Sequence, residues 1–203
     1  MRTLKQPIKV IDNFFETAEV WRHYALKQDF ARDENSTWPG TRTATLDQLN
    51  IELFNSLATS IINHMHDKKY FSLLKINFAL VDTSYNIGWM HQDEPQYNVA
   101  GVIFLNKNAP ANTGLSFYHK IADNNQDYNS IFFEELKADL EDRKAYVKFK
   151  EEQRTLFKRN MTVENVFNRC VMFPPDQFHA ADGYFGNTID DSRLTINFFG
   201  IAV

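Results

Sequence analysis

The hydrophobic period of the chain changes near Tyr70, and this change separates two kinds of predicted structure. Before it, from residue 46 to about residue 65, apolar side chains recur at every fourth position, which predicts an amphipathic helix. These positions are Leu49, Leu53, Leu57 and Ile61. After it, apolar side chains occupy every second position, which predicts a half-buried strand. These positions are Leu74, Ile76, Phe78 and Leu80.

Shorter apolar segments predict further elements on both sides of this point. The opening stretch "PIKVIDNFF" is typical of a short strand, and residues 16–28 favour a helix that faces inward through Val20, Trp21 and Tyr24. Further strands are expected at 99–105, 114–118, 170–173 and 193–202. Many short strands separated by turn residues favour a sandwich or barrel-like jelly roll over a parallel α/β sheet.

A charged stretch at about residues 130–160 interrupts these predicted strands. It is rich in strong helix formers, and its apolar residues are sparse. We therefore expect one or two surface helices, inserted between strands as a solvated cover.

Length and composition narrow the classes of protein that fit this pattern. With 203 residues and no repeat or linker, a single domain over residues 1–203 is expected. The formal net charge of −4 gives no reason to expect nucleic-acid binding. No apolar run reaches the roughly 18 residues of a membrane span, and the first residues do not resemble a signal peptide. The single cysteine, Cys170, excludes an internal disulfide, so a cytoplasmic protein is expected, with its oligomeric state open.

His91 and Asp93 lie two positions apart in the aromatic-rich stretch "GWMHQDEPQY". If this stretch is a strand, both side chains point to the same face and can reach one metal ion. Alone the pair is weak evidence, because a chain with 6 histidines and 26 acidic residues can contain such a pair by chance. His179, beyond the apolar segment "CVMF", adds a second imidazole from a separate strand. Two histidines and one carboxylate form the facial triad that binds non-haem Fe(II) and leaves coordination positions open.

Arg193 begins the last predicted strand and follows His179 in the sequence. A guanidinium at this place can form a bidentate pair with the distal carboxylate of an organic acid that binds the same metal. The candidate site therefore combines a metal triad with a cation for an acidic co-substrate.

The order of these motifs resembles that of the Fe(II)/2-oxoglutarate-dependent oxygenases, in the branch of prolyl 4-hydroxylase-like proteins. Besides H-x-D, "FPPDQFH" and "RLT", this branch has segments similar to "VIDNFF", "WPGTRT", "VIFLN", "NTGLSFY" and "NRCVMFPPDQFHAADGYFG". The resemblance covers roughly residues 6–120 and 163–202. The charged stretch between them is the poorest match.

The resemblance implies a double-stranded β-helix, which is a mainly β or α+β jelly roll of the cupin kind, with N-terminal helices packed on one sheet. It also implies one Fe(II), 2-oxoglutarate as co-substrate and O2. His91, Asp93 and His179 would be the catalytic metal ligands, and Arg193 would anchor 2-oxoglutarate.

A second anchor for 2-oxoglutarate stays open. The strand that ends in "FLN" carries Phe104 where related hydroxylases often have a tyrosine that supports the 2-oxoglutarate carboxylate. Thr195, Tyr85 and Asn77 are the candidates that could take over this role.

The predicted function is hydroxylation of a peptide or protein side chain, or of a small metabolite, with release of succinate and CO2. The residues expected near such a substrate are Trp38, Arg42, Trp89, Tyr97 and His119. A different metal-dependent oxidation is the alternative among enzymes, although Asp93 argues against halogenation because a halide needs the position of this carboxylate. Outside the enzymes, the alternative is a non-catalytic jelly-roll binding or structural module in which the H-x-D is coincidental.

Overall fold

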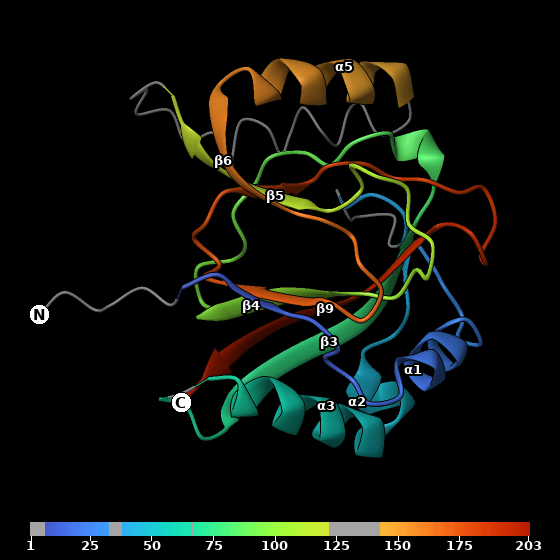
Figure 1. Ribbon diagram of the computed structural model, residues 1–203, viewed down its shortest axis with the longest axis vertical. Helices are drawn as coiled ribbons and strands as arrows, with labels where there is room; N and C mark the ends of the chain where they lie inside the picture. Colours follow the sequence, from blue (N-terminus) through green and yellow to red (C-terminus); the bar gives the residue numbers. More distant parts are fainter. Residues whose placement is uncertain (1–6, 33–37, 66, 122–142) are drawn as a thin grey trace, which may run out of the picture.

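The strands of the protein form two antiparallel sheets that face each other (Figure 1). The computed structural model describes residues 7–32, 38–65, 67–121 and 143–203. In chain order the elements are β1 (Lys9–Ile11), α1 (Ala18–Ala25), β2 (Thr41–Arg42), α2 (Leu46–Leu49), α3 (Ile51–Asn63), β3 (Phe71–Val81), the 3-10 turn η1 (Thr83–Tyr85), β4 (Val99–Phe104), β5 (Leu115–Lys120), α5 (Arg143–Arg154), β6 (Phe157–Val163), β7 (Cys170–Phe173), β8 (His179–Ala181) and β9 (Arg193–Ala202).

The larger sheet has six strands in the order β1-β7-β4-β9-β3-β2, and the smaller sheet has three in the order β6-β5-β8. The longest pairing joins β3 to β9, from Phe71 opposite Ala202 to Val81 opposite Arg193. Strands that are neighbours in a sheet are often far apart in the sequence, as expected for a jelly roll. The predicted mainly antiparallel β architecture is therefore confirmed.

One face of the larger sheet forms the main hydrophobic core with the N-terminal helices. Because side chains alternate along a strand, Ile76 and Phe78 of β3 and Phe198 of β9 point to this face. There they join Trp21 of α1 and Leu57 of α3, all of them buried. In Figure 1 these helices lie below the larger sheet, and the smaller sheet lies on its other side. The opposite face of β3 and β9 is thus left to line the space between the sheets.

Two details of the helices differ from the sequence prediction. The helix expected from residue 46 to residue 65 is split, because Asn50 has an extended backbone and its side chain accepts a hydrogen bond from the Leu53 N–H at 3.0 Å. Asn50 is thus the N-cap of α3 and ends α2, a role that asparagine favours. In α1, Trp21 is buried as expected, but Val20 is exposed.

The charged stretch is also only partly helical. Residues 143–154 form α5, whereas residues 157–163 form the edge strand β6 of the smaller sheet; residues 122–142 lie outside the described part of the chain. The expectation of a purely solvated cover is wrong for α5, because its Lys150 and Gln153 are buried.

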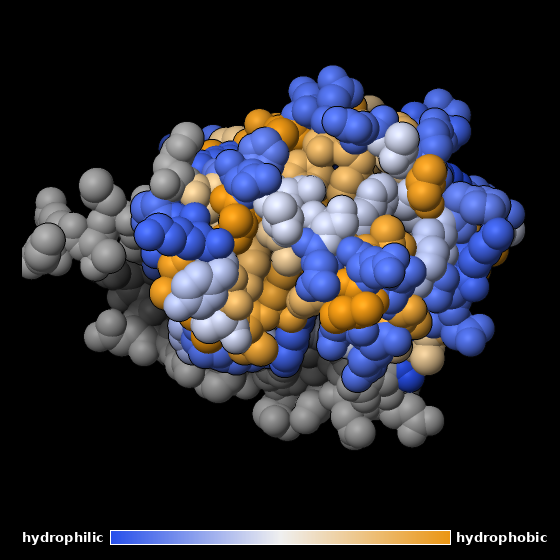
Figure 2. Space-filling view, turned by 90° about the horizontal axis from the view of Figure 1, so that it is seen from below, coloured by the Kyte–Doolittle hydropathy of each residue, from blue (hydrophilic) through white to orange (hydrophobic). Residues whose placement is uncertain are grey.

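Hydrophobic surface on the helical side of the molecule is interrupted by polar residues. Figure 2 views the protein from below, and hydrophilic and hydrophobic side chains are mixed on this face. Among the described residues, no helix has both the length and the apolar character that crossing a membrane requires.

Candidate metal centre

Both histidines of the predicted triad lie at the edge of the smaller sheet. His179 begins β8, and His91 pairs with it through an isolated antiparallel bridge. The His91 N–H donates to the His179 carbonyl at 3.1 Å, and the His179 N–H donates to the His91 carbonyl at 2.9 Å. The stretch around His91 is therefore not the regular strand that was expected. It is a loop that touches β8 as a fourth strand would.

Asp93 is held in place by the segment that precedes β8. Its backbone N–H donates to the Pro175 carbonyl at 2.9 Å, so the residue is tied to the turn that precedes His179. The backbone contacts of His91 and Asp93 thus bring the H-x-D motif and "FPPDQFH" together, although 79 residues separate them in the sequence.

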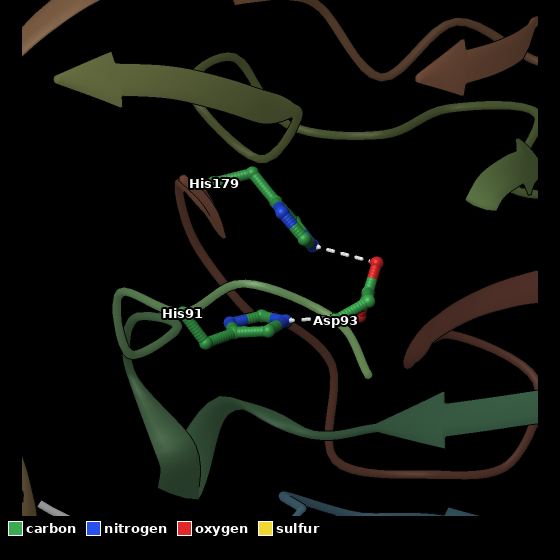
Figure 3. Close-up of side chains that lie close together, drawn as sticks. All are labelled: His91, Asp93 and His179. Carbon is green, nitrogen blue, oxygen red and sulfur yellow. Dashed lines mark ion pairs between the residues drawn. The ribbon is translucent and has the colours of Figure 1, made fainter. Parts of the chain in front are cut away.

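The three side chains converge on one point (Figure 3). The Nε2 atom of His91 lies 3.7 Å from Oδ1 of Asp93, and the Nε2 atom of His179 lies 3.7 Å from Oδ2 of the same carboxylate. One ligand atom from each residue lies within 4.8 Å of the others. These distances are too long for hydrogen bonds, and they leave a gap between three potential ligands.

Hydrogen bonds to the backbone orient both imidazole rings. The Nδ1 atom of His91 lies 3.0 Å from the Trp89 carbonyl oxygen, and the Nδ1 atom of His179 lies 2.8 Å from the Gln177 carbonyl oxygen. A carbonyl oxygen only accepts, so each Nδ1 carries a hydrogen, and each ring is held with its Nε2 atom toward Asp93. Histidine ligands of metals are commonly fixed in this way.

The charge state of the site also fits a metal. Burial lowers the pKa of His91 well below its ordinary value, and nearby His179 adds to this effect, so the His91 ring is neutral and free to coordinate. Burial raises the pKa of Asp93, although His179 opposes the shift. The Oδ2 atom of Asp93 is buried without a hydrogen-bond partner among the described residues. A buried polar atom in this state is costly unless a ligand satisfies it, and a divalent cation would do so.

Aromatic rings pack against both histidines of the triad and help to bury it. The rings of Trp38 and Trp89 each lie 4.6 Å from the His91 ring, and the Phe173 ring lies 4.5 Å from the His179 ring. The triad opens into a cavity of about 850 Å³ between the two sheets. A cavity of this size is ample for a small organic acid together with part of a second ligand.

Arg193 supplies a buried positive charge to the same cavity. The residue is 5% exposed, and its guanidinium lies 5.4 Å from the Phe104 ring and 5.7 Å from the Tyr184 ring. Its Nε donates to the Thr113 carbonyl at 3.2 Å, and no carboxylate of the described residues lies within 4.0 Å of it. Burial lowers the pKa of Arg193. A buried guanidinium without a carboxylate partner is a natural binding site for an anion.

The candidates for a second anchor lie in different places. Thr195 and Asn77 line the cavity, and Oδ1 of Asn77 is buried without a partner among the described residues. The Thr195 hydroxyl donates to Asn197 at 3.0 Å. Tyr85 is not among the cavity residues, and its hydroxyl accepts a hydrogen bond from Arg32.

Most of the residues expected near a substrate line the cavity. These are Trp38, Arg42, Trp89 and Tyr97. His119 does not; it lies near the end of β5, where its ring contacts Asn160 of β6.

Tyr184 is a cavity residue that the sequence did not single out. It follows β8, lines the cavity beside Arg193, and its pKa is raised by burial while the Arg193 and Arg42 charges oppose the shift. Only its position shortly after His179 could have drawn attention to it.

Gly88 permits the close approach of the His91 loop to β8. A Cβ atom at this position would lie 2.7 Å from the Ala181 backbone nitrogen and 2.9 Å from its oxygen, both rigid backbone atoms. Gly88→Ala is therefore expected to push the loop away from β8 and to weaken metal binding at least severalfold. Titration with Mn(II), followed by electron paramagnetic resonance, checks this. Gly183→Ala is the control, because the Gly183 Cβ would meet the backbone of Asn112 in a different loop. Equal affinities in both variants would contradict the prediction.

Comparisons with known structures support the same architecture. A prolyl-4-hydroxylase from Pseudomonas putida matches with a TM-score of 0.52 and 13% identity, over 96% of this chain and 91% of that chain. HygX from Streptomyces hygroscopicus, with nickel, 2-oxoglutarate and hygromycin B bound, matches with a TM-score of 0.60 and 10% identity, over 97% and 84% of the two chains.

A prolyl hydroxylase from Trichoplax adhaerens, in complex with a peptide fragment of the hypoxia inducible factor oxygen degradation domain, is also similar. Its TM-score is 0.55 with 12% identity, and the match covers 96% of this chain and 83% of that chain. At these identities the likeness concerns the fold, which is the one found in 2-oxoglutarate- and Fe(II)-dependent oxygenases and was expected from the sequence. No curated protein matches the sequence. A family model matches residues 1–200, so the chain belongs to the Family of unknown function (DUF6445).

Proposed function

We propose that this chain is an Fe(II)- and 2-oxoglutarate-dependent dioxygenase that hydroxylates its substrate, acting as one domain over residues 1–203. The observation that carries the proposal is the convergence of two oriented imidazoles and one buried, unsatisfied carboxylate at one point of a cavity. This donor set, with open positions on one side, suits non-haem Fe(II). The similar structure with nickel and 2-oxoglutarate bound supports this choice of co-substrate.

Each part of the site has a role in this proposal. His91, Asp93 and His179 hold the metal, and Arg193 holds the distal carboxylate of 2-oxoglutarate. Iron and 2-oxoglutarate, when bound, supply O2 activation, in which the oxo acid is oxidised to succinate and CO2 while a substrate C–H bond is hydroxylated. The aromatic wall of Trp38, Trp89 and Phe173 keeps bulk water from the reacting groups.

For the substrate we favour a peptide or protein side chain over a small metabolite. Trp38 and Tyr97 line the cavity from loops and Arg42 lines it from the short strand β2, and we take these three side chains as the wall that an extended ligand would contact. Similar structures include a complex with a peptide and a complex with hygromycin B, so both substrate classes fit this fold. The net charge of −4 disfavours nucleic acid.

Succinate formation tests the proposal. The purified protein with Fe(II), ascorbate and 2-oxoglutarate should release succinate in air, slowly without substrate and faster with one. A library of proline- and lysine-containing peptides and a metabolite pool are compared, and mass spectrometry detects the product that is 16 Da heavier. Stimulation by the metabolite pool alone would overturn the preference for peptides. Absence of both metal binding and succinate release would favour a non-catalytic jelly-roll module.

A further inference from the structure

Helix α5 binds the backbone of the loop that leads to His91. Three of its polar side chains form hydrogen bonds with this loop, and one of the three also reaches β8. Lys150 donates to the carbonyl oxygens of Tyr85 and Ile87, and Gln153 bonds to Met90. Arg154 donates to the carbonyls of Gly88 at 3.2 Å and Ala181 at 2.8 Å.

The contact between Gln153 and Met90 imitates a pairing between strands. The Gln153 Oε1 accepts from the Met90 N–H at 2.7 Å, and its Nε2 donates to the Met90 carbonyl at 2.7 Å. In an antiparallel pair, successive residues direct their backbone groups to opposite sides. His91 faces His179 of β8, so Met90 faces away from the sheet. There the carboxamide of Gln153 takes the place of the missing neighbouring strand.

Burial makes this contact hard to replace. Met90 is 1% exposed and Gln153 is 2% exposed, so water has little access to either partner. Lys150 is 0% exposed, and a buried ammonium group is tolerated only where hydrogen bonds satisfy it. A helix can cover a sheet with apolar side chains alone, so these buried polar contacts are not needed for covering. They are all made with residues just before His91.

Arg154 connects the two segments that carry the histidines. Gly88 precedes His91 in the loop, and Ala181 ends the strand that His179 begins. By donating to both carbonyls, one guanidinium fixes the distance between these segments. The spacing of the two imidazoles is therefore set partly from α5.

We propose that α5 is the positioning element of the metal centre, with Gln153 as its central residue. By fixing Met90, Gln153 sets the direction in which the His91 ring leaves the backbone, while Lys150 and Arg154 hold the flanking carbonyls. Gln153 does not touch the metal and acts through His91. The inference rests on the proposed function only in taking the ligand of the triad to be a divalent metal.

Three variants test this role. Gln153→Met keeps the length of the side chain and removes both hydrogen bonds, and Gln153→Glu keeps the acceptor for the Met90 N–H. Glu152→Met is the control, because Glu152 neighbours Gln153 on α5, and its exposed side chain pairs only with exposed Lys148, at 3.8 Å, among the described residues. The dissociation constant of Mn(II) is measured anaerobically, together with the melting temperature and the hydrogen exchange of residues 85–93 in the metal-free protein.

We expect Gln153→Met to weaken Mn(II) binding about ten- to a hundredfold, the usual effect of losing a residue that orients a ligand. Gln153→Glu should lie between this variant and the wild type, and Glu152→Met should bind as the wild type does. The Met90 amide should exchange faster in Gln153→Met, with no change in β3 and β9. If Gln153→Met does not fold, the Mn(II) affinity of Gln153→Glu and the hydrogen exchange of its Met90 amide test the inference instead.

Other outcomes overturn the inference in distinct ways. A lower melting temperature with unchanged Mn(II) affinity would make α5 a structural cover only. Unchanged exchange at Met90 would show that Gln153 does not fix this residue. If the wild-type protein itself binds no divalent metal, the proposed function fails, and the exchange of the Met90 amide alone decides whether α5 fixes the loop.

Discussion

Asp93→Ala is expected to abolish tight binding of Fe(II) or Mn(II) while the protein stays folded. The variant removes the only anionic ligand of the triad and leaves His91, which burial keeps neutral, and His179. It also removes a carboxylate oxygen that has no hydrogen-bond partner among the described residues, so the metal-free protein loses no such bond at this atom. Metal affinity and fold stability should therefore respond very differently to this change.

Thermal unfolding separates these two effects. Free metal at about 100 times its Kd stabilises a folded protein by about 2.7 kcal/mol. For a chain of this size, this corresponds to a rise in Tm of roughly 5–10 °C. The wild type should show this rise and Asp93→Ala should show none. Glu94→Ala removes the neighbouring exposed carboxylate and should still show the metal-dependent rise in Tm. A full rise in Asp93→Ala would rule out the triad as the metal site.

Arg193→Ala is expected to raise the KM for 2-oxoglutarate roughly ten- to a hundredfold. A hydrogen bond to a charged group contributes about 1.5–3 kcal/mol, and every 1.4 kcal/mol changes affinity about tenfold. Arg193 is buried, has no described carboxylate within 4.0 Å and lines the cavity that contains the triad. An incoming carboxylate would therefore meet a desolvated cation with its charge still available.

Two further variants show whether Arg193 itself is the anchor. Arg193→Lys keeps the charge but loses the planar fork, so its KM should lie between those of the wild type and Arg193→Ala. Lys75→Ala removes a lysine that lines the same cavity, close to the Tyr97 ring. The affinity for Mn(II) should equal that of the wild type in Arg193→Ala, Arg193→Lys and Lys75→Ala. A raised KM in Lys75→Ala and a normal one in Arg193→Ala would move the anchor to Lys75.

The role of α5 explains why one helix of a charged stretch can matter for the proposed chemistry. The loop before His91 has β8 on one side and side chains of helix α5 on the other. The described part of the stretch thus both completes the smaller sheet through β6 and braces the metal centre through α5.

Much of the architecture could be predicted from the sequence because it depends on local periodicity. The alternation through Leu74–Leu80 gives β3, the segments at 99–105 and 193–202 give β4 and β9, and these strands bury their apolar faces as their patterns require. The residue types and order of His91, Asp93, His179 and Arg193 also predicted that these four side chains would share one site, and the structure brings them to the same cavity. In the first case the cause is a two-residue repeat of apolar side chains, and in the second it is a set of metal-binding residue types. Both can be recognised in the sequence without knowledge of the fold.

Tertiary structure decided what no local pattern could encode. Strands β2 and β8, with two and three residues, are too short to show a period, and they exist because long neighbours pair with them. The H-x-D motif lies in a loop rather than a strand, since only one bridge links it to β8. Gln153 carries no signal of its own in a charged helix. Its importance comes from a contact with Met90 across 63 residues of chain, where burial leaves a backbone N–H and C=O that only this side chain reaches among the described residues.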